Sequence, residues 1–340
     1  MEKVKLIEIC TPKQWKTLAT SELKDNGKYL VYGANGVIGY YDDYNHEKET
    51  VLITCRGATC GNVHISKEKS YINGNAMALD NLNEKVCLKE YLYYFLKQYD
   101  MKKVISGSAQ PQITIQSLKK IEVKITDKDT QIKIVKKLNK IQQIIDVRKK
   151  QIGELDELIK SQFVEIFGNP ITNDKGYPLV DFINIVKLQR GYDLPNQERD
   201  NTGNISVYGA NGILDKHIIS KCSKGIITGR SGTIGKVYYS FDEFWPLNTT
   251  LFSIETYGNN IIYLKYLLDM FELKRFVDAT GVPTLNRNIV HKQKIIKVPI
   301  ELQNKFAEFV KQINKQKIEI QKSLEKIQKL QESLMDKCFQ

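Results

Sequence analysis

Two long stretches of the chain carry apolar residues in alternating steps of three and four. The first runs from Thr130 to Phe167, with gaps only at Arg148 and Gln162. This heptad spacing puts one apolar stripe along a helix and is typical of a helix that packs against another long helix. About forty residues at about 1.5 Å each predict a rod of roughly 60 Å. The stripe consists of Ile134, Leu138, Ile141, Ile145, Ile152, Leu155, Ile159 and Ile166.

The last forty residues of the chain repeat this stripe 172 positions later. Identical residues recur at the same offset, so the chain reads as two copies of one design, a globular part followed by a long helix. Heptads of this length are mostly structural, and we expect a spacer and docking surface rather than a catalytic centre. The second stripe consists of Phe306, Val310, Ile313, Ile320, Leu324, Ile327, Leu334 and Cys338, and the recurring identities include Gln131 with Gln303, Leu158 with Leu330, Ser161 with Ser333 and Phe167 with Phe339.

Shorter segments precede each rod and predict two globular parts of mixed secondary structure. Residues 89–97 have the spacing of a short amphipathic helix, and residues 263–268 repeat it. Gly168 and Pro170 end the first rod. Strands are expected at residues 6–9, 28–32, 51–54 and 121–125. The predicted domains are 1–126 and 169–300 for the globular parts and 127–168 and 301–340 for the long helices.

Three motifs occur once in each globular part. Tyr-Gly-Ala-Asn-Gly stands at residues 32–36 and again at 208–212, and Asn-Gly favours a tight turn because it tolerates positive φ. Residues 54–63 recur as 228–237, keeping Thr, Arg, Thr, Gly and Val in place. A polar loop surrounds Pro111 and again Pro283. The remainder of the two parts has diverged, which indicates an old internal duplication.

The glycines of the first motif also raise the possibility of a nicotinamide-dependent oxidoreductase. Residues 33–39 look like a dinucleotide-binding turn, and Tyr93 and Lys97 match a Tyr-x-x-x-Lys pair. Such a turn must open a helix, whereas the residues that follow have poor helix propensity. The second copy has Asp215 where the third glycine should stand. We therefore keep this enzyme class only as a competing hypothesis, which cofactor binding by the purified protein would decide.

No other catalytic or metal-binding pattern is predicted. Residues 229–237 fail as a phosphate loop, because five residues separate the glycines and Val237 follows Lys236. Neither Asn-Pro-Pro-Tyr nor Asp-Pro-Pro-Tyr, the adenine methyltransferase signature, occurs in the chain. The four histidines do not repeat between the halves, which argues against a metal site or a catalytic triad. They are His46, His64, His217 and His291.

The charge and the cysteines narrow the class of protein. The net charge is +12 with a pI of about 9.1; each long helix carries +2, which leaves +8 on the globular parts. This excess favours a polyanionic partner such as nucleic acid. The six cysteines neither repeat nor show Cys-x-x-Cys spacing, so we expect reduced thiols in the cytoplasm. No apolar run approaches the length of a membrane span, and no membrane association is expected.

In their order and duplication, these features resemble the DNA-specificity subunit of a type I restriction–modification system. The resemblance covers the whole chain and implies an α+β fold: two mixed α/β target-recognition domains in tandem repeat, each followed by a long helix, the helices pairing as an antiparallel coiled coil. Each domain would read one part of a bipartite site in double-stranded DNA. Two modification (methyltransferase) subunits and restriction (translocase/endonuclease) subunits would supply the chemistry, with S-adenosylmethionine, ATP and Mg bound only there. A coiled-coil adaptor without DNA specificity remains the alternative.

The candidate DNA-binding residues divide into shared and divergent positions. Shared features should serve the fold and phosphate contact: the turns with Asn35 and Asn211, and the loops with Arg56, Thr59, Arg230 and Thr233. Residues 190–192 have no clear counterpart among residues 10–28, which puts a DNA contact by that segment of the first half in doubt. Base reading should fall to residues that differ: Lys67, Gln110 and Gln112 in the first part, and Arg190, Tyr192, Lys236, Asn286 and Arg287 in the second.

Overall fold

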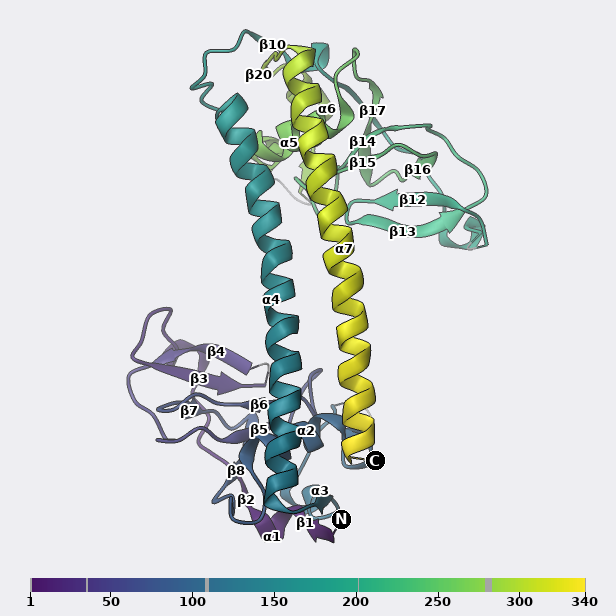
Figure 1. Cartoon of the computed structure of the whole chain (residues 1–340). Helices are drawn as coiled ribbons and strands as arrows, with labels where there is room; N and C mark the ends of the chain where they lie inside the picture. Colours follow the sequence, from purple (N-terminus) through teal and green to yellow (C-terminus); the bar gives the residue numbers. More distant parts are fainter. Residues whose placement is uncertain (1, 35, 108–109, 201, 279–282, 340) are drawn as a thin grey trace. The chain divides into compact units, whose positions relative to one another are not determined.

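The computed structural model describes residues 2–34, 36–107, 110–200, 202–278 and 283–339 (Figure 1). They form two compact units. The first unit contains Met1–Arg148 with Ser323–Gln340, and the second contains Lys149–Lys322. Each unit consists of one globular head and a part of each of the two long helices, α4 (Lys128–Phe167) and α7 (Ile300–Phe339).

The first head is built on two small sheets. A four-stranded antiparallel sheet has the order β2-β8-β5-β6, and a three-stranded sheet has the order β4-β3-β7. A separate pair joins β1, near the N-terminus, to β9, the strand that precedes α4 in the chain. The elements are β1 Glu2–Lys5, α1 Leu6–Ile9, β2 Thr11–Gln14, β3 Tyr29–Gly33, β4 Gly36–Tyr41, β5 Val51–Thr54, β6 Val63–Ile65, β7 Tyr71–Ile72, β8 Ala76–Asp80, α2 Lys89–Gln98, α3 Ile115–Leu118 and β9 Glu122–Ile125.

The second head repeats this plan. Its four-stranded sheet has the order β11-β17-β14-β15 and its three-stranded sheet the order β13-β12-β16, while β10 pairs with β20 as β1 pairs with β9. The elements are β10 Leu179–Asp181, β11 Lys187–Arg190, β12 Ile205–Gly209, β13 Gly212–His217, β14 Gly225–Gly229, β15 Val237–Ser240, β16 Phe244–Pro246, β17 Thr250–Glu255, α5 Ile261–Met270, β18 Val277–Asp278, β19 Thr284–Leu285, α6 Arg287–His291 and β20 Lys294–Ile296.

One predicted strand is wrong. Residues 6–9 form the short helix α1. Leu6 and Ile9 are both buried, and a spacing of three puts them on the same side of a helical turn, whereas a strand would turn them to opposite faces. The preceding residues, Glu2–Lys5, supply the strand that pairs with β9.

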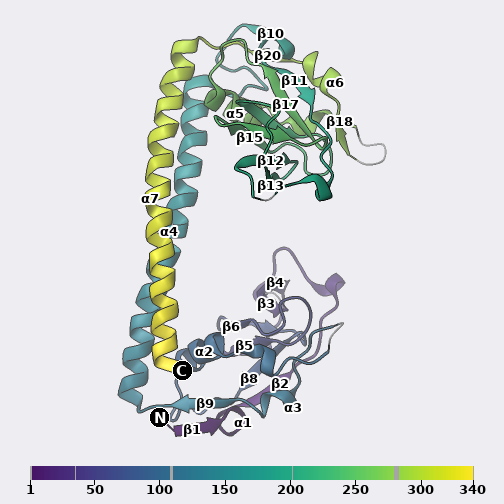
Figure 2. The same ribbon diagram turned by 90° about the vertical axis from the view of Figure 1, so that its right-hand side faces the viewer.

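The two long helices pack against each other and run antiparallel within each unit (Figures 1 and 2). The first unit joins the beginning of α4 to the end of α7, and the second unit joins the end of α4 to the beginning of α7. Both heads, the helices and their pairing agree with the predicted α+β class. Lys317, a cation on the apolar stripe, pairs with Asp156 of α4.

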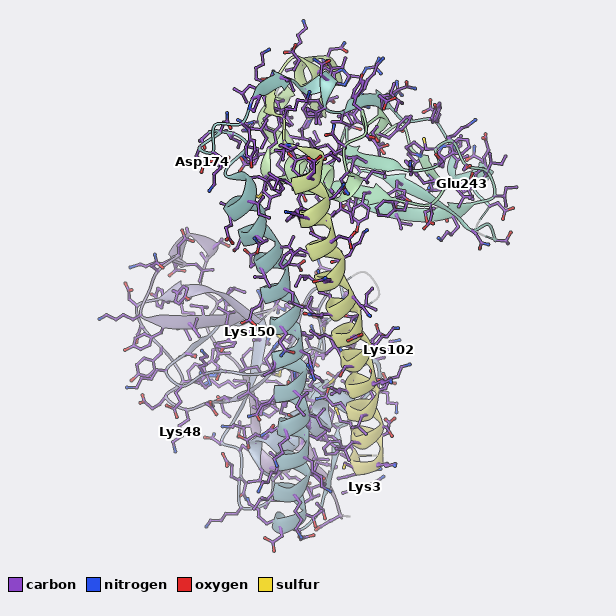
Figure 3. All side chains as sticks on the ribbon, turned by 45° about the horizontal axis from the view of Figure 1, so that its top comes forward. Lys3, Lys48, Lys102, Lys150, Asp174 and Glu243 are labelled. Carbon is purple, nitrogen blue, oxygen red and sulfur yellow. The ribbon has the colours of Figure 1, made fainter. Side chains whose placement is uncertain are left out.

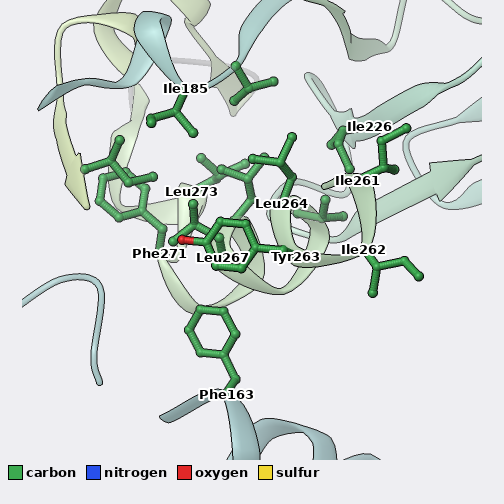
Figure 4. Packing of buried hydrophobic residues seen from close by; sticks show 14 of the residues in the cluster. Phe163, Ile185, Ile226, Ile261, Ile262, Tyr263, Leu264, Leu267, Phe271 and Leu273 are labelled. Atoms are coloured by element: carbon green, nitrogen blue, oxygen red, sulfur yellow. The ribbon is translucent and has the colours of Figure 1, made fainter. Parts of the chain in front are cut away.

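The apolar stripe shifts near the end of α4. Steps of four from Ile159 to Phe163 and Phe167 replace the predicted continuation through Ile166, and all three side chains are fully buried. Phe163 packs on Tyr263 of α5 inside the core of the second head (Figure 4). Phe167 packs on the same ring. Both phenylalanine rings also pack edge-on against Phe306 of α7, so the end of α4 contacts its partner helix and the core of the second head together.

The phenylalanines that recur at the ends of the long helices pack against aromatic residues of the heads. Phe167 packs edge-on against Tyr263 with ring centroids 5.0 Å apart, and Phe339 packs against Tyr91 of the first head at 5.2 Å. Each head thus contacts the beginning of one long helix and the end of the other.

Gln131 and Gln303 fasten each long helix to the head that precedes it. Both side chains are buried. Gln131 donates to the carbonyls of Val86 and Thr126 and accepts from the amide of Leu88. Gln303 does the same in the second unit: it donates to the carbonyl of Val298 and to Asn259 and accepts from the amide of Asn260. Their recurrence has a structural reason, because buried backbone groups must be hydrogen-bonded.

The dinucleotide hypothesis does not fit the local structure. Gly36, with φ at +80°, closes the β3–β4 hairpin and begins a strand instead of a helix. No helix N-terminus therefore follows the glycines to hold a pyrophosphate. The six cysteines are free thiols, and burial raises the pKa of Cys10 and Cys87 to about 12. Within the described ranges, none of the helices is both long and apolar enough to cross a bilayer.

Candidate nucleic-acid interface

In the second head, three strands bring two arginines to one edge of the four-stranded sheet. Arg190 at the end of β11 pairs with Leu251, and Gly229 at the end of β14 pairs with the neighbouring Thr250. Because β11 and β14 both run antiparallel to β17, which lies between them, their carboxyl ends lie at the same end of the sheet. Arg190 and Arg230 are therefore neighbours, although forty residues separate them in the chain.

A polar network holds this pair of guanidinium groups. Arg230 donates from Nε to the carbonyl oxygen of Asn248 at 2.9 Å, and the Asn248 amide donates to Asp193. Asp193 lies 4.0 Å from Arg190. Partial burial and the like charge of Arg190 lower the pKa of Arg230, while Asp193 acts in the opposite direction. Two cations held this closely with a single carboxylate favour an additional anion such as a phosphate.

Residues 283–286, the described part of the polar loop around Pro283, lie at the same edge; residues 279–282 are outside the described residues. The amide of Leu285 donates to the carbonyl of Arg230 at 2.8 Å. Asn286 accepts from the amide of Asn288 and caps α6, which gives this residue a structural role that its sequence context did not predict. Arg287 follows as the exposed first residue of α6. Lys236 also lies here, because its carbonyl accepts a hydrogen bond from Thr228 of β14.

Tyr192 adds an aromatic surface to this edge. Its half-exposed ring packs against Trp245 and Phe252, and the ammonium group of Lys221 lies 5.7 Å from the ring centroid. An exposed ring beside a cation can stack on a base or pack along the sugar–phosphate backbone.

The first head forms a smaller version of this edge. Arg56 pairs with Gln112 across an isolated bridge, and the amide of Ile113 donates to the carbonyl of Cys55 at 3.0 Å. Gln112 is exposed beside Arg56, and Gln110, two residues earlier in the chain, is exposed as well. Amide side chains next to a cation can read adenine while the cation contacts a phosphate.

Two shared motifs are tied to each other by the structure. The hydroxyl groups of Thr54 and Thr59 both donate to the carbonyl of Ala34 at 2.7 Å, so the hairpin turn is fixed to the Arg56 loop. A Cβ on Gly33 would come within 2.7 Å of the Ile38 side chain, and one on Gly209 within 2.3 Å of Leu214. Both neighbouring side chains are exposed and flexible, so a Cβ at the first glycine of either Tyr-Gly-Ala-Asn-Gly motif would only require them to shift.

Some predicted site residues lie elsewhere. Lys67 lies at the opposite end of β5 from Arg56, because the adjacent Ser66 donates to the carbonyl of Thr50. Asn211 is exposed at the tip of the β12–β13 hairpin, and Thr233 belongs to the loop that follows Arg230. Asn35 is outside the described residues.

Arg190 has a structural counterpart in the first head, although the sequence showed no clear one. Gln14 ends β2 and pairs with Met77 of β8, just as Arg190 ends β11 and pairs with Leu251 of β17. Its amide donates to Cys55 Sγ at 3.0 Å and to the carbonyl of Gly74 at 3.1 Å. The first head therefore has a neutral, internally bonded side chain where the second has an exposed arginine.

Three contributors were missed by sequence reasoning: Asp193, Lys221 and Asn248. They lie outside the duplicated motifs, and only the fold brings them beside Arg190 and Tyr192. The basic excess is also spread well beyond this edge, as exposed Lys48, Lys102 and Lys150 show (Figure 3).

Comparisons with known proteins agree with this duplicated plan. The sequence profile of the type I restriction modification DNA specificity domain matches residues 1–157 and again residues 175–332. Since these two matches cover most of the sequence, the chain belongs to that family.

Individual relatives share the family at low sequence identity. A putative type I specificity subunit of Mycoplasma pneumoniae is 28% identical over 167 residues, which cover 44% of this chain and 55% of the relative. The MjaIX specificity subunit of a type I restriction enzyme from Methanocaldococcus jannaschii is 25% identical over 344 residues, which cover 85% and 76%. The chain thus spans about half the length of the Mycoplasma pneumoniae relative.

Solved structures share the fold. The S subunit of a type I restriction–modification system from M. genitalium superposes with a TM-score of 0.64 at 17% identity, covering 100% of this chain and 96% of that one. A structure concerned with complex assembly and conformational transition of the type I system gives 0.57 at 13% identity, covering 100% and 97%.

Proposed function

We propose that this chain is the DNA-reading subunit of a type I restriction–modification complex. Each head contacts one part of a bipartite site in double-stranded DNA with the sheet edge that carries Arg56 or Arg230. The observation that supports this most directly is that both heads place an arginine loop and a divergent polar loop side by side. Phosphate contacts by the shared arginines position the protein, and the divergent loops read bases.

The proposal assigns the chemistry to other subunits. Two methyltransferase subunits carry S-adenosylmethionine, and restriction subunits carry ATP and Mg. This chain supplies sequence choice and a docking surface and has no methyltransferase, nuclease or ATPase activity of its own. Turnover by the purified chain, free of partner subunits, would contradict this assignment.

The long helices suit the docking of two equal partners. Leu158 of α4 and Leu330 of α7 recur at the same offset, and both are exposed large apolar side chains in the described structure. One such leucine on each helix offers one equivalent anchor per methyltransferase subunit. Replacing both with glutamate should prevent assembly while leaving the heads folded and able to bind DNA.

A domain exchange tests the reading function. Residues 171–300 would be replaced by the corresponding head of another specificity subunit, and the methylated motif would be determined by methylome sequencing of cells carrying the complete complex. One half of the motif should change and the other should remain. A change in both halves, or in neither, would refute the two-reader proposal.

A further inference from the structure

A groove of about 420 Å³ lies in the second unit beside the outer face of α7. Tyr239 and Phe241 from β15 and the segment after it, Ile262 of α5 and Ile318 of α7 form its apolar lining. Phe241 and Ile318 are each 56% exposed. Large apolar side chains gathered at one exposed place are typical of a surface that binds another protein.

The apolar surface continues towards the hairpin of the same head. A second hollow of about 360 Å³ shares Tyr239 with the groove and is also lined by Tyr208, Tyr238 and Ile213. Ile213, near the tip of the β12–β13 hairpin, is another strongly exposed aliphatic residue. Together the two hollows form one strip, which we call the α7–β15 strip.

Lysines line the α7–β15 strip. Lys311, Lys315 and Lys322 lie on the same face of α7 as Ile318, and Lys265 lines the second hollow. Glu308 pairs with Lys311 and Asp269 with Lys265. Glu319 is the acidic residue among those lining the groove. The strip therefore has an apolar floor and a basic rim.

The first head does not repeat this surface. At the matching positions Lys67 replaces Phe241, Glu90 replaces Ile262 and Asp146 replaces Ile318. Three of the four apolar residues of the groove are thus exchanged for charged ones, and Tyr239 is matched by Ile65. The exposed leucines Leu158 and Leu330 occur on both helices, whereas the α7–β15 strip occurs in the second unit alone among the described residues.

We infer that the α7–β15 strip binds an acidic, apolar-faced segment of one methyltransferase subunit. This inference rests on the proposed function and adds that the two methyltransferase subunits dock unequally. The copy beside the second head buries its apolar side chains against Phe241 and Ile318, with its carboxylates among the lysines. The copy beside the first head meets charged residues at the same place and binds by the remaining, shared contacts. An apolar floor favours protein over DNA, because the phosphate backbone has little apolar surface to bury there.

The test measures how many methyltransferase subunits bind the full-length chain. Phe241→Glu and Ile318→Glu, singly and together, would be compared with wild type by titration with purified methyltransferase subunit and native mass spectrometry. Leu179→Glu is the matched control, since Leu179 is 51% exposed on the same head but lies outside both hollows. Circular dichroism and the thermal midpoint would establish that each variant folds.

We expect the double variant to bind one of the two methyltransferase subunits at least tenfold more weakly, so that a one-to-one complex accumulates. The control should form the same complex as wild type. Lys315→Glu with Lys322→Glu should weaken the same binding event and reduce its dependence on salt.

Five results would count against this inference. Unchanged binding of both subunits, or equal weakening of both, would overturn it. Intact assembly with weaker DNA binding would make the strip a DNA contact instead. Sedimentation could show that the wild-type chain forms a dimer and that the double variant does not, while binding of the methyltransferase subunits is unchanged. The occupant of the strip would then be a second copy of this chain. If wild type binds DNA but no methyltransferase subunit at all, the proposed partner itself is wrong, which is a distinguishable failure.

Discussion

The two heads share a framework and differ in what they place on it. Arg56 and Arg230 follow equivalent strands, yet Gln14 stands in the first head where Arg190 stands in the second. The difference is physical, because Gln14 is engaged with Cys55 and Gly74 whereas Arg190 is exposed beside Arg230. The strands and turns are thus kept in both heads, while the polar groups at the sheet edge have diverged.

The largest difference between equivalent substitutions in the two long helices is expected in the free energy of unfolding, at positions of the apolar stripe. Ile313 of α7 is 6% exposed, whereas Ile141, its equivalent in α4, is only partly buried. Ile313→Asp should destabilise its unit by about 3–5 kcal/mol because it leaves an uncompensated buried charge. Ile141→Asp should cost clearly less. Urea unfolding followed by circular dichroism measures both, and equal effects would contradict the distinction.

Gln131 and Gln303 should behave alike, since they make equivalent hydrogen bonds in the two units. Replacing either with leucine leaves buried backbone groups unsatisfied, each costing about 1–3 kcal/mol. Thermal unfolding of Gln131→Leu and Gln303→Leu should show similar losses. Gln143→Leu, on the exposed surface of α4, serves as the control and should change little.

Substitution of a proposed base-reading residue should affect one half-site only, whereas substitution of a proposed phosphate contact should affect all DNA sequences. Arg287→Ala should cost about 1–3 kcal/mol of binding on the cognate site and relax one position of one half-site. Fluorescence anisotropy with a set of single-base variants measures this. If all sequences lose affinity equally, Arg287 contacts phosphate and is not a reader.

The shared arginines should have smaller and similar effects on every sequence. Arg230→Ala should weaken binding to cognate and unrelated DNA alike and reduce the salt slope by about one unit for one lost phosphate contact. Arg56→Ala should do the same through the first head. Binding titrations at several salt concentrations would show this, and a loss confined to cognate DNA would contradict the shared role.

The smallest effect concerns Gly153 in the middle of α4. A Cβ at this position would meet no atom within 4 Å, so packing does not require glycine there. Gly153→Ala should therefore stabilise the helix by roughly 0.5–1 kcal/mol. Gly191 is the useful contrast, because a Cβ there would approach the carbonyl of Leu247 to 2.2 Å. Thermal midpoints of the two alanine variants should move in opposite directions.

Much of the architecture could be predicted because its signals are local and occur twice. The three-and-four spacing specifies a helix and its packing face without knowledge of the partner, and the repeated Tyr-Gly-Ala-Asn-Gly motif specifies a hairpin turn. The same local reasoning failed at residues 6–9, where four apolar-rich residues are too few to distinguish a strand from one turn of helix.

Only part of the candidate site could be predicted from such local sequence signals. Arg230, Asn286 and Arg287 do lie together at one sheet edge, but their grouping depends on strand order and register, which join residues distant in the chain. Lys67 and Lys236 were both predicted as base readers, yet Lys67 lies at the far end of its strand. Asp193 and Asn248 carry no sequence signal at all.

The sequence by itself determined the duplication, the two long helices and the basic character of the heads, because periodicity and charge are properties of the chain alone. Only the tertiary structure decided that Gln14 corresponds to Arg190, that Phe163 enters a head core, and that Phe241 and Ile318 share one exposed groove. These relations come from packing between segments that are far apart in the sequence. Residue types alone do not specify which distant residues become neighbours.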